Sequence, residues 1–452
     1  MLIRFTVSNF LSFKDETEFN MLTGDVKRHP HHVYKREHID VLRAAAIYGA
    51  NGAGKSNLIK AIAFLKSLVE GKDVLKTYEK FKLSDEYFTK PSEIEIEFEI
   101  NGIAYAYGIV FDHSIIFEEW LYKVNFEKED EIVFERKTNI KGINKLKFDK
   151  KYSRTEKDKH FIEFYEKELL TPSVSFISTT KNEHFKDVQL IKQWFWSSLL
   201  IMLPTYRPIE MFGKLFFYPQ LRAIFSELIK GFDTGLVSID FKKELPTYIP
   251  PHVINNNSPF TEKMNPLITN FYGVHVEIQN KSVNVYSYEN GNVYKNELVG
   301  YREVEGKKIE FKLDEESDGT IRLLDLLPIY LEMSAKDVVY VIDEINQSIH
   351  PLLLKMFLKE VMEMKESKGQ IIFTTHESNL LDLDIFRQDE IWFAEKNQEG
   401  ATQFYPLSEF KIRYDLDIRK GYLNGRFGAI PFLENLEKLN QNTHAEKEPI
   451  SK

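Results

Sequence analysis

Alternating hydrophobic and polar positions predict antiparallel strands in the first part of the chain. Residues 1–20 begin with such an alternation, which is the pattern of a half-buried strand. The strict alternation over 93–100 is followed by Asn101-Gly102, a favoured two-residue turn, and by the apolar stretch 103–110. These features predict a β-hairpin, and with a further strand expected at 118–122 they predict a small antiparallel layer.

Continuous apolar runs are typical of strands that are buried on both faces of a parallel sheet. The chain has such runs at 42–48, 338–342 and 370–376, the last of which ends in a histidine. Apolar residues at helical spacing follow the first run over 58–69 and precede the second over 321–331. Strands and helices that alternate in this way predict an α/β fold with a parallel core.

The loop between the first apolar run and its helix has the residue types of a phosphate-binding P-loop, GxxxxGK followed by Ser or Thr. Its glycines let backbone N–H groups turn toward a phosphate, and the amino end of the helix favours an anion. We expect Lys55 to supply a charge to the β- and γ-phosphate oxygens and the Ser56 hydroxyl to bind Mg²⁺. The expected ATP-binding residues are Gly49, Ala50, Asn51, Gly52, Ala53, Gly54, Lys55, Ser56 and Asn57.

Two carboxylates follow the apolar run 338–342, at the edge where ligands bind in open α/β sheets. We expect Asp343 to hold Mg²⁺ together with Ser56, and Glu344 to polarise the attacking water. His376 ends the next apolar run, and we expect it to contact the γ-phosphate or the water. The alternative for His376 is a structural role at the end of a buried strand.

A further motif lies before the helix expected at 321–331. Ser317 and Gly319 stand at its amino end, where they can form a second anion cradle. The order of P-loop, Ser-x-Gly, Asp-Glu and His resembles that of ABC-class ATPases, and the long separation of Lys55 from Asp343 resembles the split heads of the RecF and structural-maintenance-of-chromosomes group. The resemblance implies a P-loop NTPase with an ABC-type head, in which a mixed central sheet is flanked by helices and joined by an antiparallel β layer.

A narrower resemblance is to bacterial stand-alone ATPases of the overcoming-lysogenization-defect and abortive-infection type, such as the ATPase subunits of PARIS- and Septu-like anti-phage systems. The segments that carry it are Asn9–Phe13, Asp343–Pro351 and Arg419–Pro431. It covers roughly residues 1–125 and 310–432. It implies a composite head formed by 1–125 and 306–432, a mainly helical insertion over 126–305 and a polar tail over 433–452.

Two segments of the expected insertion have open interpretations. Residues 137–159 are rich in lysine and arginine, which would suit a nucleic acid or an acidic partner, but without interleaved aromatic residues a solvated hairpin or loop is the preferred interpretation. Trp194-Phe195-Trp196 is expected to belong to a core or an interface rather than to a base-stacking platform.

The sequence also departs from the ABC pattern. No glutamine precedes Gln189, so the expected glutamine after the P-loop helix is missing, and Ser317-Asp318-Gly319-Thr320 is a degenerate signature. These differences are consistent with slow or triggered hydrolysis. After His376 we expect no room for a Toprim nuclease domain, so we expect the chain to lack a nuclease of its own.

Composition narrows the remaining possibilities. The chain has no cysteine, which excludes disulfides, iron–sulfur clusters and thiolate zinc sites, and its net charge of −9 disfavours general attraction to nucleic acid. No signal peptide is expected at the N-terminus, and the apolar run 194–203 is too short to span a bilayer, so we expect a cytoplasmic protein without membrane contact. His29, His31, His32 and His38 could form a metal site, but a solvated loop is the preferred interpretation.

The resemblance implies an ATPase that uses ATP and Mg²⁺ and forms a homo-oligomer, at least a dimer, through heads that sandwich ATP. We expect such an assembly to control a separately encoded effector, a nuclease or a toxin, in anti-phage defence. One alternative is a RecF-like ATPase for DNA maintenance, and another is a scaffold that ATP stabilises with little turnover. An unrelated P-loop kinase is disfavoured because it would leave the Ser-x-Gly motif and His376 unexplained.

Overall fold

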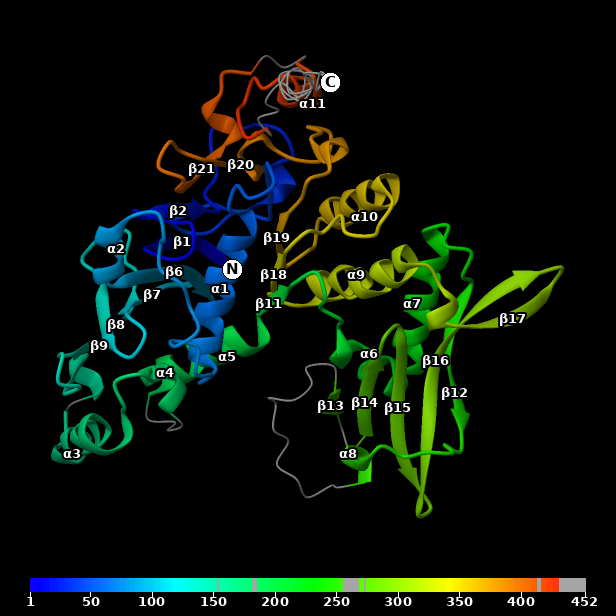
Figure 1. Cartoon of the computed structure of the whole chain (residues 1–452), viewed down its shortest axis with the longest axis horizontal. Coiled ribbons are helices and arrows are strands. Elements are labelled where there is room, and N and C mark those ends of the chain that lie inside the picture. The colour runs from blue at the N-terminus through cyan, green and yellow to red at the C-terminus, as the bar shows by residue number, and fades with distance from the viewer. Residues whose placement is uncertain (153, 181–184, 255–267, 272–273, 413–415, 431–452) are drawn as a thin grey trace, which may run out of the picture.

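The computed structural model describes residues 1–152, 154–180, 185–254, 268–271, 274–412 and 416–430. Its strands form three large sheets and one short pair, β3 (Val33–Tyr34) with β4 (Val41–Leu42). Figure 1 shows the first sheet, formed by strands within 2–20 and 92–148, on one side of the central sheet, which contains the strand at 44–49. The third sheet, formed by strands within 238–312, lies on the other side. The central sheet therefore connects the two sides of the molecule.

The central sheet is parallel except at one edge, as the continuous apolar runs predict. Its order is β11 (Leu199–Met202), β18 (Val339–Ile342), β19 (Gln370–Thr374), β5 (Ala44–Gly49), β20 (Ile391–Lys396) and β21 (Thr402–Pro406), and only β21 is antiparallel to its neighbour. Three helices accompany these strands, namely α1 (Lys55–Val69), α9 (Asp318–Ala335) and α10 (Pro351–Glu363). The expected α/β P-loop NTPase fold with a mixed central sheet is confirmed.

The two faces of the central sheet bury separate hydrophobic cores. Along β5, Ala45 and Ile47 belong to the core that contains α1, whereas Ala46 and Tyr48 belong to the core that contains α9 and α10. Successive side chains of a strand point to opposite faces, so an uninterrupted apolar strand is the sequence that this double burial requires.

The antiparallel sheet has the order β10-β9-β8-β7-β6-β1-β2. The expected hairpin is confirmed, since Asn101 and Gly102 join its two strands with φ of 52° and 82°, the positive values that a type I′ turn requires. The bounds are β1 (Leu2–Ser8), β2 (Thr17–Asn20), β6 (Ser92–Ile100), β7 (Ile103–Phe111), β8 (Ile116–Lys123), β9 (Glu131–Thr138) and β10 (Asn144–Phe148), and the short helix α2 (Asp85–Thr89) precedes β6.

The third sheet is antiparallel and is packed against α6 (Ile209–Phe217) and α7 (Pro219–Gly231). Its strands are β12 (Ser238–Glu244), β16 (Asn292–Val304), β15 (Ser282–Glu289), β14 (Val274–Gln279) and β13 (Ile268–Phe271) in spatial order, and β17 (Lys307–Lys312) also pairs with β16. The strands expected over 273–312 are thus present. The short helix α8 (Pro251–Ile254) precedes β13 in the chain.

The expected insertion, 126–305, does not form one separate unit. Strands β9 and β10 extend the antiparallel sheet, and β11 is an edge strand of the central sheet. Between them lie α3 (Glu156–Phe164), the π-helical turn Tyr165–Leu169, α4 (Phe176–Thr179) and α5 (Lys186–Ser197). Helices thus predominate only over 156–231, and the later part of the range is mainly strand. Sequence composition missed these boundaries because sheet pairing across distant segments decides them.

The apolar run 194–203 consists of the end of α5 and strand β11. Trp194 and Phe195 are buried and Trp196 is exposed, so the core interpretation is confirmed for the first two aromatic residues. Among the described residues, no helix combines the length and the apolar character that crossing a membrane requires.

A buried ion pair ties residues 171–177 to the antiparallel sheet. The Arg136 guanidinium lies 3.3 Å from a Glu119 carboxylate oxygen, both side chains are fully buried, and Arg136 also donates to the carbonyls of Thr171 and Val174. Glu119 in turn accepts from the backbone N–H of Phe176 at 2.8 Å. Burial raises the pKa of Glu119 and Arg136 opposes that shift, so the two charges depend on each other.

We predict that Arg136→Ala lowers the free energy of unfolding by about 3–5 kcal/mol, because it leaves Glu119 buried without its partner. The matched control is Lys137→Ala, which removes an exposed lysine that pairs with Glu118 at 3.4 Å and should cost at most about 1 kcal/mol. Urea unfolding followed by circular dichroism measures both. Equal, small losses for the two variants would contradict the structural role of Arg136.

Candidate nucleotide-binding site

The loop between β5 and α1 contacts β20 and β21, the two strands next to β5 at one edge of the central sheet. A Cβ atom on Gly49 would lie 2.4 Å from the Ala394 carbonyl oxygen of β20. A Cβ atom on Gly54 would lie 2.0 Å from Thr402 Oγ1 of β21, and Gly54 has a φ of 107°. Glycine is therefore required at these two positions by close packing as well as by the conformation of the loop.

Three distant segments support this loop through hydroxyl and amide groups. Thr402 Oγ1 donates to the Ala53 carbonyl at 2.8 Å, and Ser12 Oγ lies 2.8 Å from Thr402 Oγ1. Asn57 Nδ2 donates to Ser12 Oγ at 2.7 Å. Thr402 was not among the residues expected at the site. Ser12 lies in the segment Asn9–Phe13, whose resemblance to the abortive-infection ATPases is the sequence feature that points to it.

Lys55 begins α1 and is buried, with 4% of its surface exposed. Its ammonium group donates to the carbonyl oxygens of Gly49 and Ala50 at 2.8 and 3.0 Å. Burial lowers the pKa of Lys55 to about 8, and the nearby carboxylates of Asp343 and Glu344 oppose this shift. Lys55 is thus a partly desolvated cation that lies close to both carboxylates.

The Asp343 carboxylate connects the carboxyl end of β18 with the start of α1 and with the end of β19. Its Oδ1 atom accepts from Ser56 Oγ at 2.9 Å and from Thr374 Oγ1, the last residue of β19, at 2.6 Å. The Thr374 hydroxyl also accepts from the backbone N–H of Glu344 at 2.8 Å. Glu344 has a φ of 50°, an uncommon value for a residue with a side chain, which is typical of functional sites. Thr374 was not expected to contribute.

His376 lies close to the same group of residues. Burial and the charge of Lys55 lower its pKa, whereas Glu344 and Asp343 raise it, so the imidazole is neutral at neutral pH. The Asn346 side-chain oxygen accepts from Thr375 Oγ1 at 2.9 Å and from the His376 N–H at 3.3 Å. The carboxyl ends of β5, β18 and β19 thus bring together Lys55, Asp343, Glu344 and His376.

These residues fit a triphosphate with Mg²⁺. The backbone of the loop 49–54 curves around the Lys55 ammonium group, which adds a positive charge. Helix α1 begins at Lys55, so its amino end lies at the same place. The hydroxyl of Ser56 and the carboxylate of Asp343 are hard oxygen donors, which suit Mg²⁺.

Ser317 and Gly319 lie elsewhere in the molecule. Ser317 caps α9, since its hydroxyl accepts from the Thr320 N–H at 3.1 Å. Ionic contacts attach this helix start to the third sheet, because Lys281 lies 2.8 Å from Asp318 and Arg302 lies 2.6 Å from Glu316. Figure 1 shows α9 on the side of that sheet and α1 on the opposite side, next to the antiparallel sheet. The fold therefore does not bring Ser317 to the P-loop of its own chain.

One loop links the two places. It starts at Asp343 and reaches Ser348, whose carbonyl oxygen lies so close to Gly319 that a Cβ atom there would be 2.8 Å away. Ser348 has a φ of 59°. The loop that follows the two carboxylates therefore packs directly on the start of α9.

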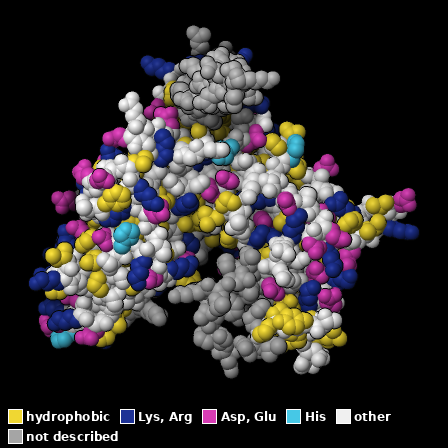
Figure 2. All heavy atoms as spheres, viewed as in Figure 1, with side chains coloured by type: hydrophobic (Ala, Val, Ile, Leu, Met, Phe, Trp, Pro, Cys, Tyr) yellow, Lys and Arg dark blue, Asp and Glu magenta, His cyan; other side chains and the backbone are white. Residues whose placement is uncertain are grey.

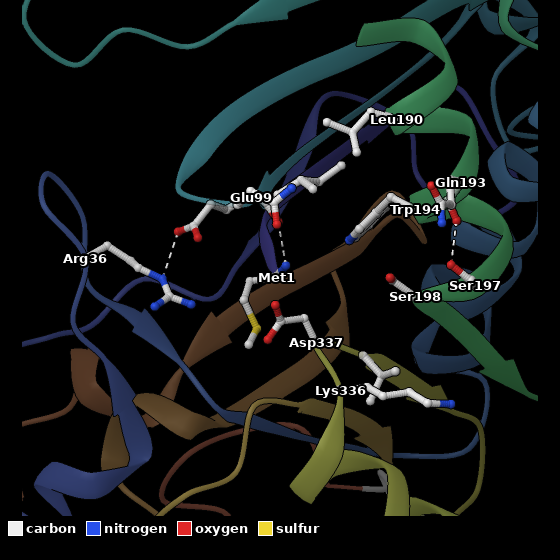
Figure 3. Close-up of a pocket in the computed structure, with 13 residues that line it drawn as sticks. Met1, Arg36, Glu99, Leu190, Gln193, Trp194, Ser197, Ser198, Lys336 and Asp337 are labelled. Atoms are coloured by element: carbon white, nitrogen blue, oxygen red, sulfur yellow. Dashed lines mark hydrogen bonds and ion pairs between the residues drawn. The ribbon is translucent and has the colours of Figure 1, made fainter. Parts of the chain in front are cut away.

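A separate cavity of about 430 Å³ lies at the amino ends of two parallel strands of the central sheet. Figure 3 shows Met1, Arg36, Glu99, Trp194 and Asp337 around it. Asp337 and Ser198 precede β18 and β11, so the cavity lies at the amino ends of these parallel strands, whereas Asp343 follows the carboxyl end of β18. The cavity is distinct from the cluster around Lys55.

Several basic side chains of the segment 137–159 are paired with acidic neighbours. Ion pairs join Lys147 to Glu135 at 2.9 Å and Lys151 to Asp187 at 3.0 Å. Lys137 and Lys159 also have acidic partners. On the face seen in Figure 2, Lys and Arg side chains are interspersed with Asp and Glu. These contacts favour the solvated-hairpin interpretation over a contact for nucleic acid.

A family model described as "AAA domain, putative AbiEii toxin, Type IV TA system" matches residues 44–382. The chain belongs to this family. The matched range includes the loop 49–56, the Asp343-Glu344 pair and His376, as well as every described strand of the third sheet. Membership in this AAA family agrees with the P-loop fold. No curated protein matches the chain.

Several solved structures are similar to the chain at low identity. The SMC head domain from Thermotoga maritima is 13% identical, with a TM-score of 0.35 over 90% of this chain and 98% of that one. An SMC head bound to the C-terminal winged-helix domain of ScpA is 12% identical, with a TM-score of 0.40 over 90% and 97%. An SMC head with an extended coiled coil, bound to the ScpA C-terminal domain derived from Pyrococcus furiosus, is 11% identical, with a TM-score of 0.36 over 97% and 99%.

We predict that Gly54→Ala destabilises the protein by about 2 kcal/mol more than Gly52→Ala, because only the first variant drives a methyl group into Thr402. Both glycines have positive φ, and a Cβ atom on Gly52 would meet nothing within 4 Å, so the control carries the backbone cost alone. Thermal and urea unfolding without nucleotide measure the difference. Equal losses would contradict the packing of the loop on β21.

Proposed function

We propose that this AAA-family protein binds and hydrolyses ATP with Mg²⁺ and that two copies assemble around the nucleotide. The observation that carries the proposal is the gathering of Lys55, Ser56, Asp343, Glu344 and His376 at the carboxyl ends of three neighbouring parallel strands. Each of these residues has the chemistry that phosphoryl transfer to water needs, and they come from two segments that are far apart in the sequence.

The proposed roles follow from these positions. The backbone of residues 49–57 surrounds the phosphates, and Lys55 exchanges its bonds to loop carbonyls for phosphate oxygens. Ser56 and Asp343 hold Mg²⁺, which when bound neutralises charge on the phosphates. Glu344 accepts a hydrogen bond from the attacking water, and neutral His376 hydrogen-bonds the γ-phosphate or that water. Thr374 positions Asp343 through its hydroxyl.

The place of Ser317 supports an assembly of two copies. Ser317 and Gly319 form a helix start on the side of the third sheet, away from α1 of the same chain, so they can reach a nucleotide only on another copy. In the proposed dimer, this helix start completes the site of the partner, and the loop from Asp343 to Ser348 connects that contact with the carboxylates of its own site.

We further propose that ATP-dependent assembly controls a separately encoded effector, a nuclease or a toxin, in anti-phage defence in the cytoplasm. The description of the family, which names a type IV toxin–antitoxin system, supports a role of this class. Slow turnover would suit such a regulator, and it is consistent with the lack of a glutamine after the P-loop helix and with the degenerate signature Ser317–Thr320.

The test combines ATP turnover with mass photometry of the wild type, Glu344→Gln and Lys55→Ala. We expect ATP with Mg²⁺ to convert wild-type monomers into dimers. Glu344→Gln should lower turnover about 100-fold or more and make the dimers persist, because the base is lost while binding remains. Lys55→Ala should prevent both. Ser317→Arg is the variant that should keep nucleotide binding in the monomer and lose assembly.

Different outcomes would support other functions. Stimulation of turnover by duplex DNA, lost in Lys141→Glu with Lys145→Glu, would favour DNA maintenance over effector control. Unchanged assembly and unchanged cellular function in Glu344→Gln, with loss of both in Lys55→Ala, would favour a scaffold that ATP stabilises. Monomers under all conditions would contradict the proposed assembly.

The lowered pKa of Lys55 predicts proton uptake on nucleotide binding above pH 8. In the free protein Lys55 is protonated below its pKa of about 8 and becomes neutral as the pH rises through that value. Bound phosphates raise the pKa, so binding at higher pH must take up a proton, and affinity should fall by up to about tenfold per pH unit above 8. Below pH 7 uptake by Lys55 should vanish.

Isothermal titration calorimetry with a slowly hydrolysed ATP analogue and Mg²⁺, in two buffers of different ionisation enthalpy, counts these protons. At pH 8.8 we expect most of one proton per site. His376→Asn is the control, because His376 is already neutral at this pH and its replacement should leave the count unchanged. Absence of uptake at pH 8.8 would contradict the burial of a titrating Lys55 at the site.

A further inference from the structure

Three histidines converge in the segment between β2 and β3. His31 and His32 lie in a short 3-10 turn, Pro30–His32, and His29 precedes it with a φ of 47°. One ring nitrogen from each of the three residues lies within 4.8 Å of the others. His32 is only 1% exposed, so the expectation of a solvated loop is wrong for this residue. His38, the fourth histidine of the expected loop, is outside the cluster.

The rings are held in place by groups from the far end of the chain. His32 Nδ1 lies 3.0 Å from Glu390 Oε2, and His29 Nε2 lies 2.8 Å from the Leu383 carbonyl oxygen. The His29 and His32 rings are stacked with centroids 4.8 Å apart, and His31 stands edge-on to His32 at 4.5 Å. A metal-binding imidazole commonly has one nitrogen fixed by a carboxylate or carbonyl in this way, while the other nitrogen binds the ion.

Two buried polar atoms in this cluster have no hydrogen-bond partner in the structure. They are His31 Nε2 and Glu390 Oε1. Leaving such atoms unpaired costs about 1–3 kcal/mol each, so their presence side by side with two fixed imidazoles needs an explanation. An ion bound among the rings would satisfy the unpaired imidazole nitrogen.

The surrounding charges are of both signs. The cations Arg43 and Arg387 face the cluster, as does the carboxylate of Glu363 at the end of α10. The two arginine charges therefore disfavour a cation at the cluster, whereas the carboxyl groups of Glu390 and Glu363 favour one.

We propose that His29, His31 and His32 bind one Zn²⁺ ion, with Glu390 orienting His32 behind it. Three imidazole nitrogens and one open position suit Zn²⁺, and tetrahedral Zn–N bonds of about 2.0–2.1 Å would place the nitrogens roughly 3.3 Å apart. The three nitrogens lie within 4.8 Å of one another in the structure, so metal binding would have to draw them closer together.

The place of the cluster separates it from the proposed nucleotide site. The Arg43 N–H, just before β5, donates to the His32 carbonyl at 2.9 Å, and Glu390 immediately precedes β20. The histidines therefore lie at the amino ends of β5 and β20, whereas the P-loop follows the carboxyl end of β5. The ion would fasten residues 29–32 to the 383–390 segment and would act on stability rather than on phosphate chemistry.

The test uses the full chain freed of metal by chelation, with Co²⁺ as a spectroscopic probe and Zn²⁺ as competitor. We expect one Co²⁺ per chain with the visible absorption of a tetrahedral site, displaced by one Zn²⁺, and a melting temperature that rises when Zn²⁺ is added. His29→Asn and His31→Asn should each weaken binding about 100-fold or more. Glu390→Gln should weaken it about 10- to 100-fold.

His160→Asn is the matched control, because His160 is exposed on α3, far along the chain from the cluster, and should leave the metal affinity unchanged. Circular dichroism of the metal-free variants shows whether each one is folded. The proposal would be overturned if the wild type bound Zn²⁺ only at millimolar concentration, or if folded His31→Asn retained the wild-type affinity. None of these measurements involves ATP, so their result is independent of the proposed ATPase.

Discussion

The carboxylate of Asp343 holds together neighbouring segments at the carboxyl ends of the parallel strands. Its Oδ1 atom accepts hydrogen bonds from Ser56 at the start of α1 and from Thr374 at the end of β19. One acceptor thus connects the end of β18 with the end of β19 and with the helix that follows β5. The buried side chain of Lys55 lies close to this carboxylate. The geometry of the whole candidate site follows from this contact, because Glu344 and His376 are the residues that directly follow the same strand ends.

The same contact connects the site to the distant third sheet. The chain leaves Asp343 through a loop with two residues of positive φ, Glu344 and Ser348, and returns to the start of α9 at Gly319. The start of α9 is in turn held by Lys281 and Arg302 of the third sheet. The loop that begins at Asp343 therefore packs directly on the helix start that contains Ser317. In the proposed dimer that surface meets the nucleotide of the other copy.

Local patterns in the sequence were sufficient for the features that local physics determines. The P-loop, its helix and the Asn101-Gly102 hairpin could be predicted because turn conformation and side-chain periodicity are encoded in a few neighbouring residues. The positions of Asp343 and His376 followed from the rule that ligands bind at the carboxyl ends of parallel strands. The roles assigned to these residues remain predictions.

Features that depend on long-range pairing could not be predicted in this way. Strands β9 and β11 lie within the expected insertion but pair with strands of the other sheets, and no local signal marks such a choice of partner. Thr402 supports the P-loop from the far end of the chain for the same reason. The sequence around residues 29–32 predicts a solvated loop because it contains no sign of the contact with Glu390. That distant residue packs against His32 and fixes its ring.

Cross-linking between two copies tests most directly whether Ser317 completes the nucleotide site of a partner. The chain has no cysteine, so Asn51→Cys and Asp318→Cys can each introduce a single thiol, and both positions are exposed. In a mixture of the two variants, each also carrying Glu344→Gln, the account predicts that a short bismaleimide joins one copy of each variant when ATP and Mg²⁺ are present. Without ATP the product should be absent. A product of equal yield without ATP, or none with it, would contradict the account.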